Sequence, residues 1–161
     1  MSEQQTPAVA WEELDELYRH TILDHYRNPR NRAVLTAPDA QARAYNPFCG
    51  DEVRLAFSVH GGHVQGVSAQ SQGCAICQSS ASLMSEMLKG KDVTKLRGLA
   101  DRFRELMRGK ALSKQEKQTF GDVEALAGVA QFPIRVKCAL LAWSTLDEAL
   151  DELEKKRGAR G

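Results

Sequence analysis

The alternation of apolar and polar residues predicts a β-hairpin in the first half of the chain. Apolar side chains occupy every second position over 53–59, and a weaker alternation follows over 64–72. The segment between them, 60–63, reads His-Gly-Gly-His, which is typical of a tight turn. A further short strand is expected near 42–45, inside an otherwise irregular surface connection over 30–46.

Apolar residues spaced three and four apart predict helices before and after this hairpin. We expect these helices over 11–26, 75–89, 92–107, 121–129 and 134–156. Asp92 or Thr94 can cap the third of them and Asp122 the fourth, because short polar side chains accept hydrogen bonds from the first turn of a helix. The polar stretch 111–118 shows no helical period and is expected to form a loop.

Length and composition restrict the class of protein. A chain of 161 residues with 42% hydrophobic residues favours a single domain over 1–161, with flexible ends at 1–9 and 158–161. The formal net charge of +1 gives no electrostatic case for a nucleic-acid or membrane partner. No apolar run approaches the roughly 20 residues of a membrane span, and the polar N-terminus is unlike a secretory signal, so we expect a cytoplasmic protein.

Four cysteines carry the candidate chemistry: Cys49, Cys74, Cys77 and Cys138. They are too few for a disulfide scaffold, and in a reducing compartment thiols or metal ligands are expected instead. Cys49 directly precedes the predicted hairpin and Cys74 directly follows it, so antiparallel pairing brings the two together. Cys74 lies at a strand-to-helix junction, and Arg135 precedes Cys138, two settings that favour the thiolate.

A carboxylate accompanies the first of these cysteines. Asp51 lies two residues after Cys49, and the intervening glycine lets the backbone turn so that both side chains face one centre. Three thiolates and one carboxylate suit Zn²⁺, and so do four sulfurs with Cys77 in place of Asp51; the residues alone leave both sets open. The histidines are expected to be structural or solvated: His20, His25, His60 and His63.

Five motifs spread over most of the chain resemble a known family. They are ILDHYRNPRN at 22–31, NPFCGDEVRL at 46–55, GCAIC at 73–77, KGK at 89–91 and FPIRVKCALLAW at 132–143. Together they resemble the iron–sulfur cluster assembly proteins of the NifU/IscU group, over about residues 14–150. Three separately placed cysteine motifs in the right order make this resemblance specific.

Two features make the chain more similar to the SufU branch than to the IscU scaffolds. IscU-type scaffolds carry a histidine directly before the third motif cysteine, and before it a Leu-Pro-Pro-Val-Lys motif that binds a chaperone. This chain has Lys137 at the first place and Phe-Pro-Ile-Arg at 132–135. It also has an extra segment, about 103–127, which the SufU branch shares and the IscU scaffolds lack.

The resemblance implies an α+β fold in which helices cover a small antiparallel sheet of about three strands, a SufE/NifU-like sandwich. It also implies one zinc ion per chain, held by Cys49, Asp51, Cys74 and Cys138. Proteins of the SufU branch generally have a residue that does not bind the metal at the position of Cys77, so a cysteine there is a departure.

The function implied by the resemblance is that of a zinc-dependent sulfurtransferase. The partner would be a pyridoxal-phosphate cysteine desulfurase of the SufS type, with Cys49 as the persulfide acceptor and Suf assembly components downstream. A histidine of the desulfurase would take the coordination place that Cys49 leaves, and Arg135 is a candidate for orienting the freed thiolate or the partner. The alternative is a scaffold that holds a transient iron–sulfur cluster with the same cysteines. A purely structural zinc is disfavoured, because closed structural sites mostly use sulfur and imidazole.

Overall fold

A three-stranded antiparallel sheet in the order β1-β2-β3 forms the base of the fold in the computed structural model, which describes residues 15–160. Its strands are β1 Ala40–Asn46, β2 Asp51–His60 and β3 His63–Gln72. Gly61 and Gly62 connect β2 to β3 with positive φ angles of 58° and 78°, the backbone that a two-residue type I′ hairpin turn requires. The predicted hairpin is confirmed.

β1, which extends over Ala40–Asn46, is longer than the strand expected near 42–45, because its sequence does not reveal clearly which face is buried. Ala40 and Ala42 point toward the core, where a stripe of small side chains lets a helix pack closely against the strand. Alanine gives a weaker alternating signal than the valine and phenylalanine of β2, so only 42–45 could be predicted.

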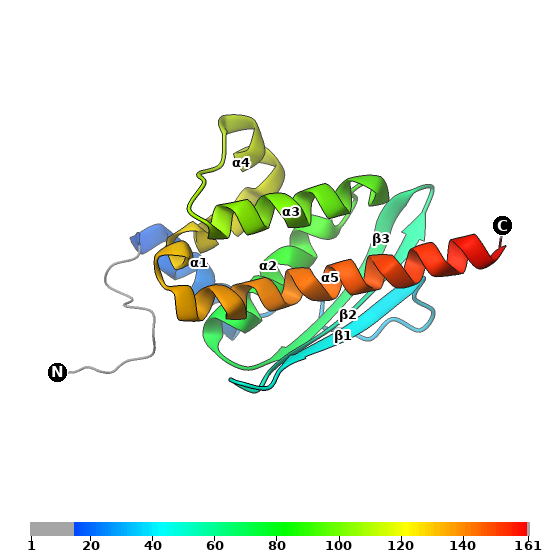
Figure 1. The fold of residues 1–161 in the computed structure, drawn as a ribbon, viewed down its shortest axis with the longest axis horizontal. Coiled ribbons are helices and arrows are strands. Elements are labelled where there is room, and N and C mark those ends of the chain that lie inside the picture. The colour runs from blue at the N-terminus through cyan, green and yellow to red at the C-terminus, as the bar shows by residue number, and fades with distance from the viewer. Residues whose placement is uncertain (1–14, 161) are drawn as a thin grey trace.

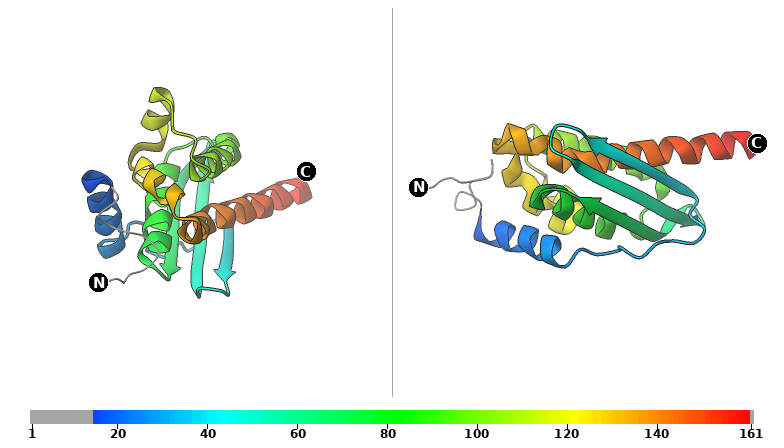
Figure 2. Two further views of the ribbon diagram at one scale, coloured as in Figure 1. Left: turned by 60° about the vertical axis from the view of Figure 1, so that its left-hand side comes forward. Right: turned by 90° about the horizontal axis from the view of Figure 1, so that it is seen from below.

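The helices gather on one side of the sheet (Figures 1 and 2). They are α1 Glu16–Arg27, α2 Ala75–Leu88, α3 Leu96–Met107, α4 Lys114–Phe120 and α5 Pro133–Arg160, with 3-10 helices η2 Val93–Lys95 and η3 Gly121–Gln131. α2 and α5 pack directly on the strands, and α1, α3 and η3 pack on those two helices. This arrangement is the expected α+β fold. Within residues 15–160 no helix has both the length and the apolar character that crossing a membrane requires.

The core is centred on Trp143 of α5. Its ring stacks on Phe103 of α3, with ring centroids 4.3 Å apart and an interplanar angle of 11°. The indole Nε1–H donates to Ser80 Oγ of α2 over 3.2 Å, and this hydroxyl donates to the carbonyl of Ala139 over 2.7 Å. One buried side chain therefore ties three helices together while its polar atom remains satisfied.

The segment expected to be a loop over 111–118 contains α4, so that prediction was wrong. Ser113 caps the helix: its hydroxyl accepts from the N–H of Glu116, whose carboxylate accepts from the N–H of Ser113. Arg102 of α3 binds the same carboxylate with a 2.7 Å ion pair. A helix of seven mostly polar residues leaves no apolar period, and only the Ser-x-x-Glu spacing signals it.

Two other helices differ from the prediction in type and length. The helix expected over 121–129 is the 3-10 helix η3, and Asp122 lies in its first turn rather than at its N-cap. α5 continues past the expected end at residue 156 as far as Arg160, so the expected flexible end from 158 is helical up to that residue. Residues 1–9, the other expected tail, and the expected start of the first helix at 11 lie outside the described residues.

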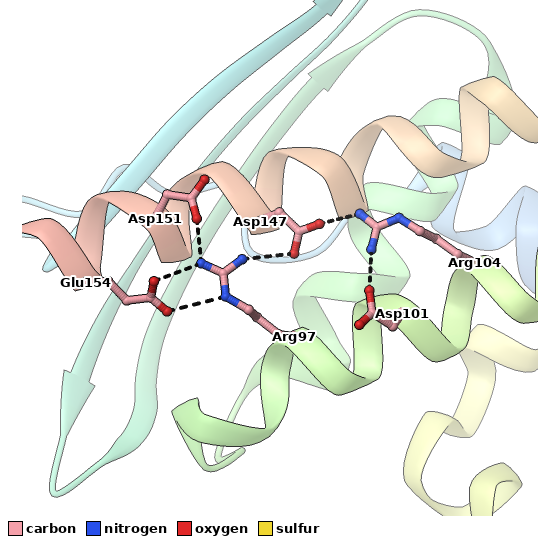
Figure 3. Close-up of polar contacts among 6 residues, drawn as sticks. All are labelled: Arg97, Asp101, Arg104, Asp147, Asp151 and Glu154. Atoms are coloured by element: carbon pink, nitrogen blue, oxygen red, sulfur yellow. Dashed lines mark hydrogen bonds and ion pairs between the residues drawn. The ribbon is translucent and has the colours of Figure 1, made fainter.

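Ion pairs hold the second half of α5 against α3 (Figure 3). Arg97 reaches Asp147, Asp151 and Glu154, with the Asp151 contact at 2.5 Å, and Arg104 pairs with Asp147 about two turns further along α3. These side chains are partly exposed, so each pair contributes at most about 1 kcal/mol. They fix the direction of α5, whose first turns carry a candidate site residue.

Candidate metal centre

Three elements meet at the end of the sheet opposite the hairpin turn and bring the predicted ligands together. Cys49 lies in the turn between β1 and β2, Asp51 is the first residue of β2, and Cys138 lies in the second turn of α5. The two sulfur atoms and a carboxyl oxygen of Asp51 all lie within 4.8 Å of one another. Residues separated by almost 90 positions in the sequence thus point at one centre.

Cys74, the fourth predicted ligand, lies beside this group of three. It is the N-cap of α2, and its backbone N–H donates to Asp51 Oδ1 over 3.1 Å. Its sulfur accepts a hydrogen bond from the backbone N–H of Cys77 over 3.5 Å. Cys74 therefore contacts Asp51 through its backbone, and its Sγ is not among the three ligand atoms that lie within 4.8 Å of one another.

Asp51 is the donor most firmly fixed by the fold. Its residue is only 1% exposed, and the second carboxyl oxygen, Oδ2, is buried without a hydrogen-bond partner. A buried polar atom left unsatisfied costs about 1–3 kcal/mol, and folds rarely retain one without a purpose. A buried carboxyl group beside the sulfur atoms of Cys49 and Cys138 fits a bound cation such as Zn²⁺.

Gly73 leaves the space that Asp51 occupies. Its φ of 138° is open to glycine alone, and a Cβ at this position would lie 2.0 Å from Asp51 Oδ1 and 2.7 Å from Cγ. The close approach lets the end of β3 pass directly over the carboxyl group. Sequence reasoning did not select Gly73, because the contact depends on the spatial position of Asp51.

The thiols of the centre differ in their protonation. A hydrogen bond from Cys138 lowers the pKa of Cys74 to about 6, helped by the N–H of Cys77 and the charge of Arg135. The same hydrogen bond and burial raise the pKa of Cys138. The pair therefore gives up one proton readily and holds the second tightly. Burial raises the pKa of Cys49 as well.

Arg135 supplies positive charge at the centre, as predicted from its place before Cys138. Its Nη1 donates to Cys138 Sγ over 3.8 Å, a distance appropriate to a sulfur acceptor. Arg135 also lines a hollow of about 360 Å³ that Cys49 borders. This side chain therefore contacts the candidate ligands on one side and open space on the other.

The other cysteine and the histidines lie outside the group of three. Cys77 is 0% exposed, and its Sγ lies 4.0 Å from the carbonyl oxygen of Gln72. His25 is buried with Nδ1 bound to Ser82 Oγ over 2.7 Å, which confirms a structural role for this histidine. His63 bonds the carbonyl of Gly61 in the hairpin turn, far from the centre along the strands.

The entrance to the centre is apolar. Cys49 is exposed, and the hollow beside it is bordered by Phe48 and Ile134, which are 96% and 72% exposed. Phe48 and Ile134 thus form an exposed apolar border to the hollow that contains Cys49. The sequence analysis did not select these two residues, although an aromatic residue next to a cysteine in a turn was a usable signal.

Comparison with known proteins identifies the family of this chain. The family model described as the NifU-like N-terminal domain matches residues 17–139. The chain belongs to this family.

Two curated relatives are similar to this NifU-like chain over most of their length. It is 40% identical over 141 residues to the zinc-dependent sulfurtransferase SufU of Bacillus subtilis, covering 88% of this chain and 94% of that protein. It is 34% identical over 142 residues to the iron–sulfur cluster assembly scaffold protein IscU of Streptococcus pyogenes, covering 88% and 87%. The resemblance to the NifU/IscU group and its SufU branch is confirmed.

A solved structure of the same family supports the fold. A putative iron–sulfur cluster assembly scaffold protein for the SUF system from Fervidobacterium islandicum superimposes with a TM-score of 0.75 at 28% identity. The match covers 88% of this chain and 99% of the other. The sheet and the helices that position the centre are therefore the family's own arrangement.

Proposed function

We propose that this NifU-like protein is a zinc-dependent sulfurtransferase of the cytoplasm. It accepts persulfide sulfur at Cys49 from a pyridoxal-phosphate cysteine desulfurase of the SufS type and delivers it to iron–sulfur cluster assembly. The observation that carries the proposal is one exposed thiol, Cys49, in contact with a buried carboxyl group that has an unpartnered oxygen. The 40% identity to a protein named for this activity supports it.

The donor set fits zinc. Cys49, Asp51, Cys74 and Cys138 would hold the ion, and Asp51 offers a buried carboxyl group with one unpartnered oxygen, next to the sulfur atoms of Cys49 and Cys138. When bound, Zn²⁺ keeps its sulfur ligands deprotonated near neutral pH. Without a cation, burial raises the pKa of Cys49, which leaves its thiol protonated.

The transfer itself is a thiol–persulfide exchange. The Cys49 thiolate attacks the outer sulfur of the donor's persulfide, a new S–S bond forms on Cys49, and the donor cysteine leaves as a thiolate. Asp51 and Cys138 stay buried during this step, and the N–H of Cys74 holds the Asp51 carboxyl group. Arg135, which bonds Cys138 Sγ and faces the hollow, orients the exposed thiolate or the incoming donor.

The second candidate function is a scaffold for a nascent cluster, and the similarity to the Streptococcus pyogenes scaffold favours it. The same three or four donors would then bind iron. Lys137, in the place where IscU scaffolds carry a histidine, makes transfer the better interpretation, since a lysine in its ordinary charged form does not bind a metal.

Sulfur transfer is tested with zinc-loaded protein, a SufS-type desulfurase and L-cysteine, following desulfurase turnover and the mass of this chain. We expect turnover to rise and one sulfur atom to be added to the peptide that contains Cys49. Cys49→Ser abolishes both effects, whereas Cys77→Ser, which also removes one thiol, retains them. Arg135→Ala lowers transfer and keeps the zinc.

Two results would contradict the proposal. Sulfur addition to Cys49→Ser at the rate of the unmodified protein would exclude Cys49 as acceptor. A stable cluster, assembled without zinc and passed intact to an apo-protein, together with no effect on the desulfurase, would establish the scaffold function instead.

A further inference from the structure

Cys74 and Cys77 occupy the two positions of a helix start at which a pair of sulfur atoms can be linked. Cys74 is the N-cap of α2, and Cys77, three residues later, lies in its first turn. Cys74 Sγ lies 3.5 Å from the backbone nitrogen of Cys77. We propose that these two residues form a reversible disulfide, which makes the start of α2 a redox modification site whose oxidant is a small-molecule disulfide.

Helix geometry favours this pairing. Side chains in a helix point toward its N-terminus, so Cys77 in the first turn points back toward Cys74. The position of Cys77 Sγ agrees, because it lies 4.0 Å from the carbonyl oxygen of Gln72, two residues before Cys74. Residues three apart on a helix have Cβ atoms about 5–6 Å apart, whereas a disulfide needs about 4 Å. The backbone of Cys74, which is extended at the N-cap and not held in the helix, has to move by about 1–2 Å for the bond to form.

The two thiols differ in access, which gives each a role. Cys74 is half-buried and can be reached by an oxidant, whereas Cys77 is 0% exposed. Cys77 also lies outside the set proposed to hold zinc, so its thiol is available to resolve a mixed disulfide. Cys138 contacts Cys74 too, but it belongs to that set and starts from a different element, α5.

The reaction is a two-step exchange. The Cys74 thiolate attacks one sulfur of the small-molecule disulfide, and one thiolate of that molecule leaves. Cys77 then loses its proton and attacks the Cys74 sulfur of the mixed disulfide, expelling the second thiolate. The two cysteines lose two electrons and their protons, and the oxidant is reduced to two thiols.

Oxidation would withdraw one sulfur donor from the centre. Here the inference rests on the proposed function, because Cys74 is assigned to the zinc site. With Cys74 committed to Cys77, three of the four donors remain, and zinc binds more weakly. The disulfide therefore couples the redox state of the surroundings to metal loading.

The experiment exposes metal-free and zinc-loaded full-length protein to oxidised glutathione and maps the disulfides with trypsin. Trypsin places Cys49, the Cys74 and Cys77 pair, and Cys138 in three different peptides, 44–54, 55–89 and 138–155. A Cys74–Cys77 disulfide thus appears as the loss of two hydrogens within peptide 55–89, with no cross-link. Zinc release into a chromophoric chelator gives a second readout that does not depend on sulfur transfer.

We expect peptide 55–89 to carry the internal disulfide, reduction to restore both thiols, and oxidation to release zinc. Cys77→Ser stops at the mixed disulfide on Cys74, and Cys49→Ser still forms the disulfide. A cross-link from peptide 55–89 to 138–155 or 44–54, or two free thiols in that peptide after oxidation, overturns the inference. Sulfur transfer by the reduced protein is measured separately, so its failure would refute the proposed function and leave the disulfide result intact.

Discussion

Replacing Gly73 with alanine tests whether the Asp51 carboxyl group has to keep its position for zinc to bind. The added methyl group would lie 2.0 Å from Asp51 Oδ1, and contacts below 3.0 Å do not occur for real Cβ atoms. The carboxyl oxygen must therefore move by about 1 Å, or the end of β3 must shift by a similar amount. Either response displaces a proposed zinc ligand.

The size of the effect follows from two separate costs. Metal–ligand distances tolerate changes of only about 0.2 Å, and disturbing even a residue that supports a ligand lowers affinity by about 10–100-fold. We expect Gly73→Ala to weaken zinc binding by about 100-fold or more. The φ of 138° adds backbone strain of about 1–3 kcal/mol, which corresponds to a fall in Tm of about 2–12 °C.

The assay compares zinc affinity, by competition with a chromophoric chelator, and Tm in the presence of the chelator. Gly90→Ala is the matched control, because Gly90 has a φ of 78° and a Cβ there meets nothing within 4 Å. It should lose Tm through strain and bind zinc normally. If Gly73→Ala binds zinc as tightly as Gly90→Ala, the carboxyl group of Asp51 is not a ligand and the proposed centre is wrong.

Three further predictions concern the fold around the centre. Trp143→Ala should lower the free energy of unfolding, measured in urea, by about 3–5 kcal/mol. Trp143→Phe should lower it less, because an aromatic ring remains to stack on Phe103, and equal losses in the two variants would contradict this. Burial lowers the pKa of His25, so the unfolded chain binds a proton more readily than the folded protein. Stability should therefore fall as the pH drops through about 6.5, the ordinary pKa of histidine, with a flatter profile in His25→Gln; parallel profiles would contradict this. Ser113→Ala should cost about 1 kcal/mol and speed hydrogen exchange in α4, and unchanged exchange would contradict it.

The hairpin and the long helices could be predicted because their periods are unmistakable. β2 alternates large apolar and polar side chains, and α2 and α5 keep apolar stripes over many turns. α4 could not be predicted by periodicity, since its stability comes from the Ser113–Glu116 capping box and an ion pair to α3. The 3-10 type of η3 could not be predicted either, because its small apolar residues are compatible with both an α-helix and a 3-10 helix.

The candidate centre could be predicted in part, because the hairpin that positions two of its residues could be predicted. Hairpin pairing alone places Cys49 near Cys74, and this follows from strand spacing. The choice of Asp51 over Cys77 came from the family resemblance, because the residues alone left both sets open. The structure adds two observations that the sequence does not contain: the unpartnered Oδ2 of Asp51 and the burial of Cys77 behind Cys74.

The exposure of the four proposed ligands gives a reason, independent of any resemblance, for Cys49 to be the acceptor. Asp51 and Cys138 are buried, and Cys74 is fixed at the N-cap of α2, so none of them can reach another protein without local unfolding. Cys49 is exposed in a short turn beside Phe48, where its thiol can turn outward while the other donors keep their positions. A centre with three fixed donors and one exposed thiol can give up one ligand to a partner and recover it afterwards, which sulfur transfer requires and a closed structural site does not.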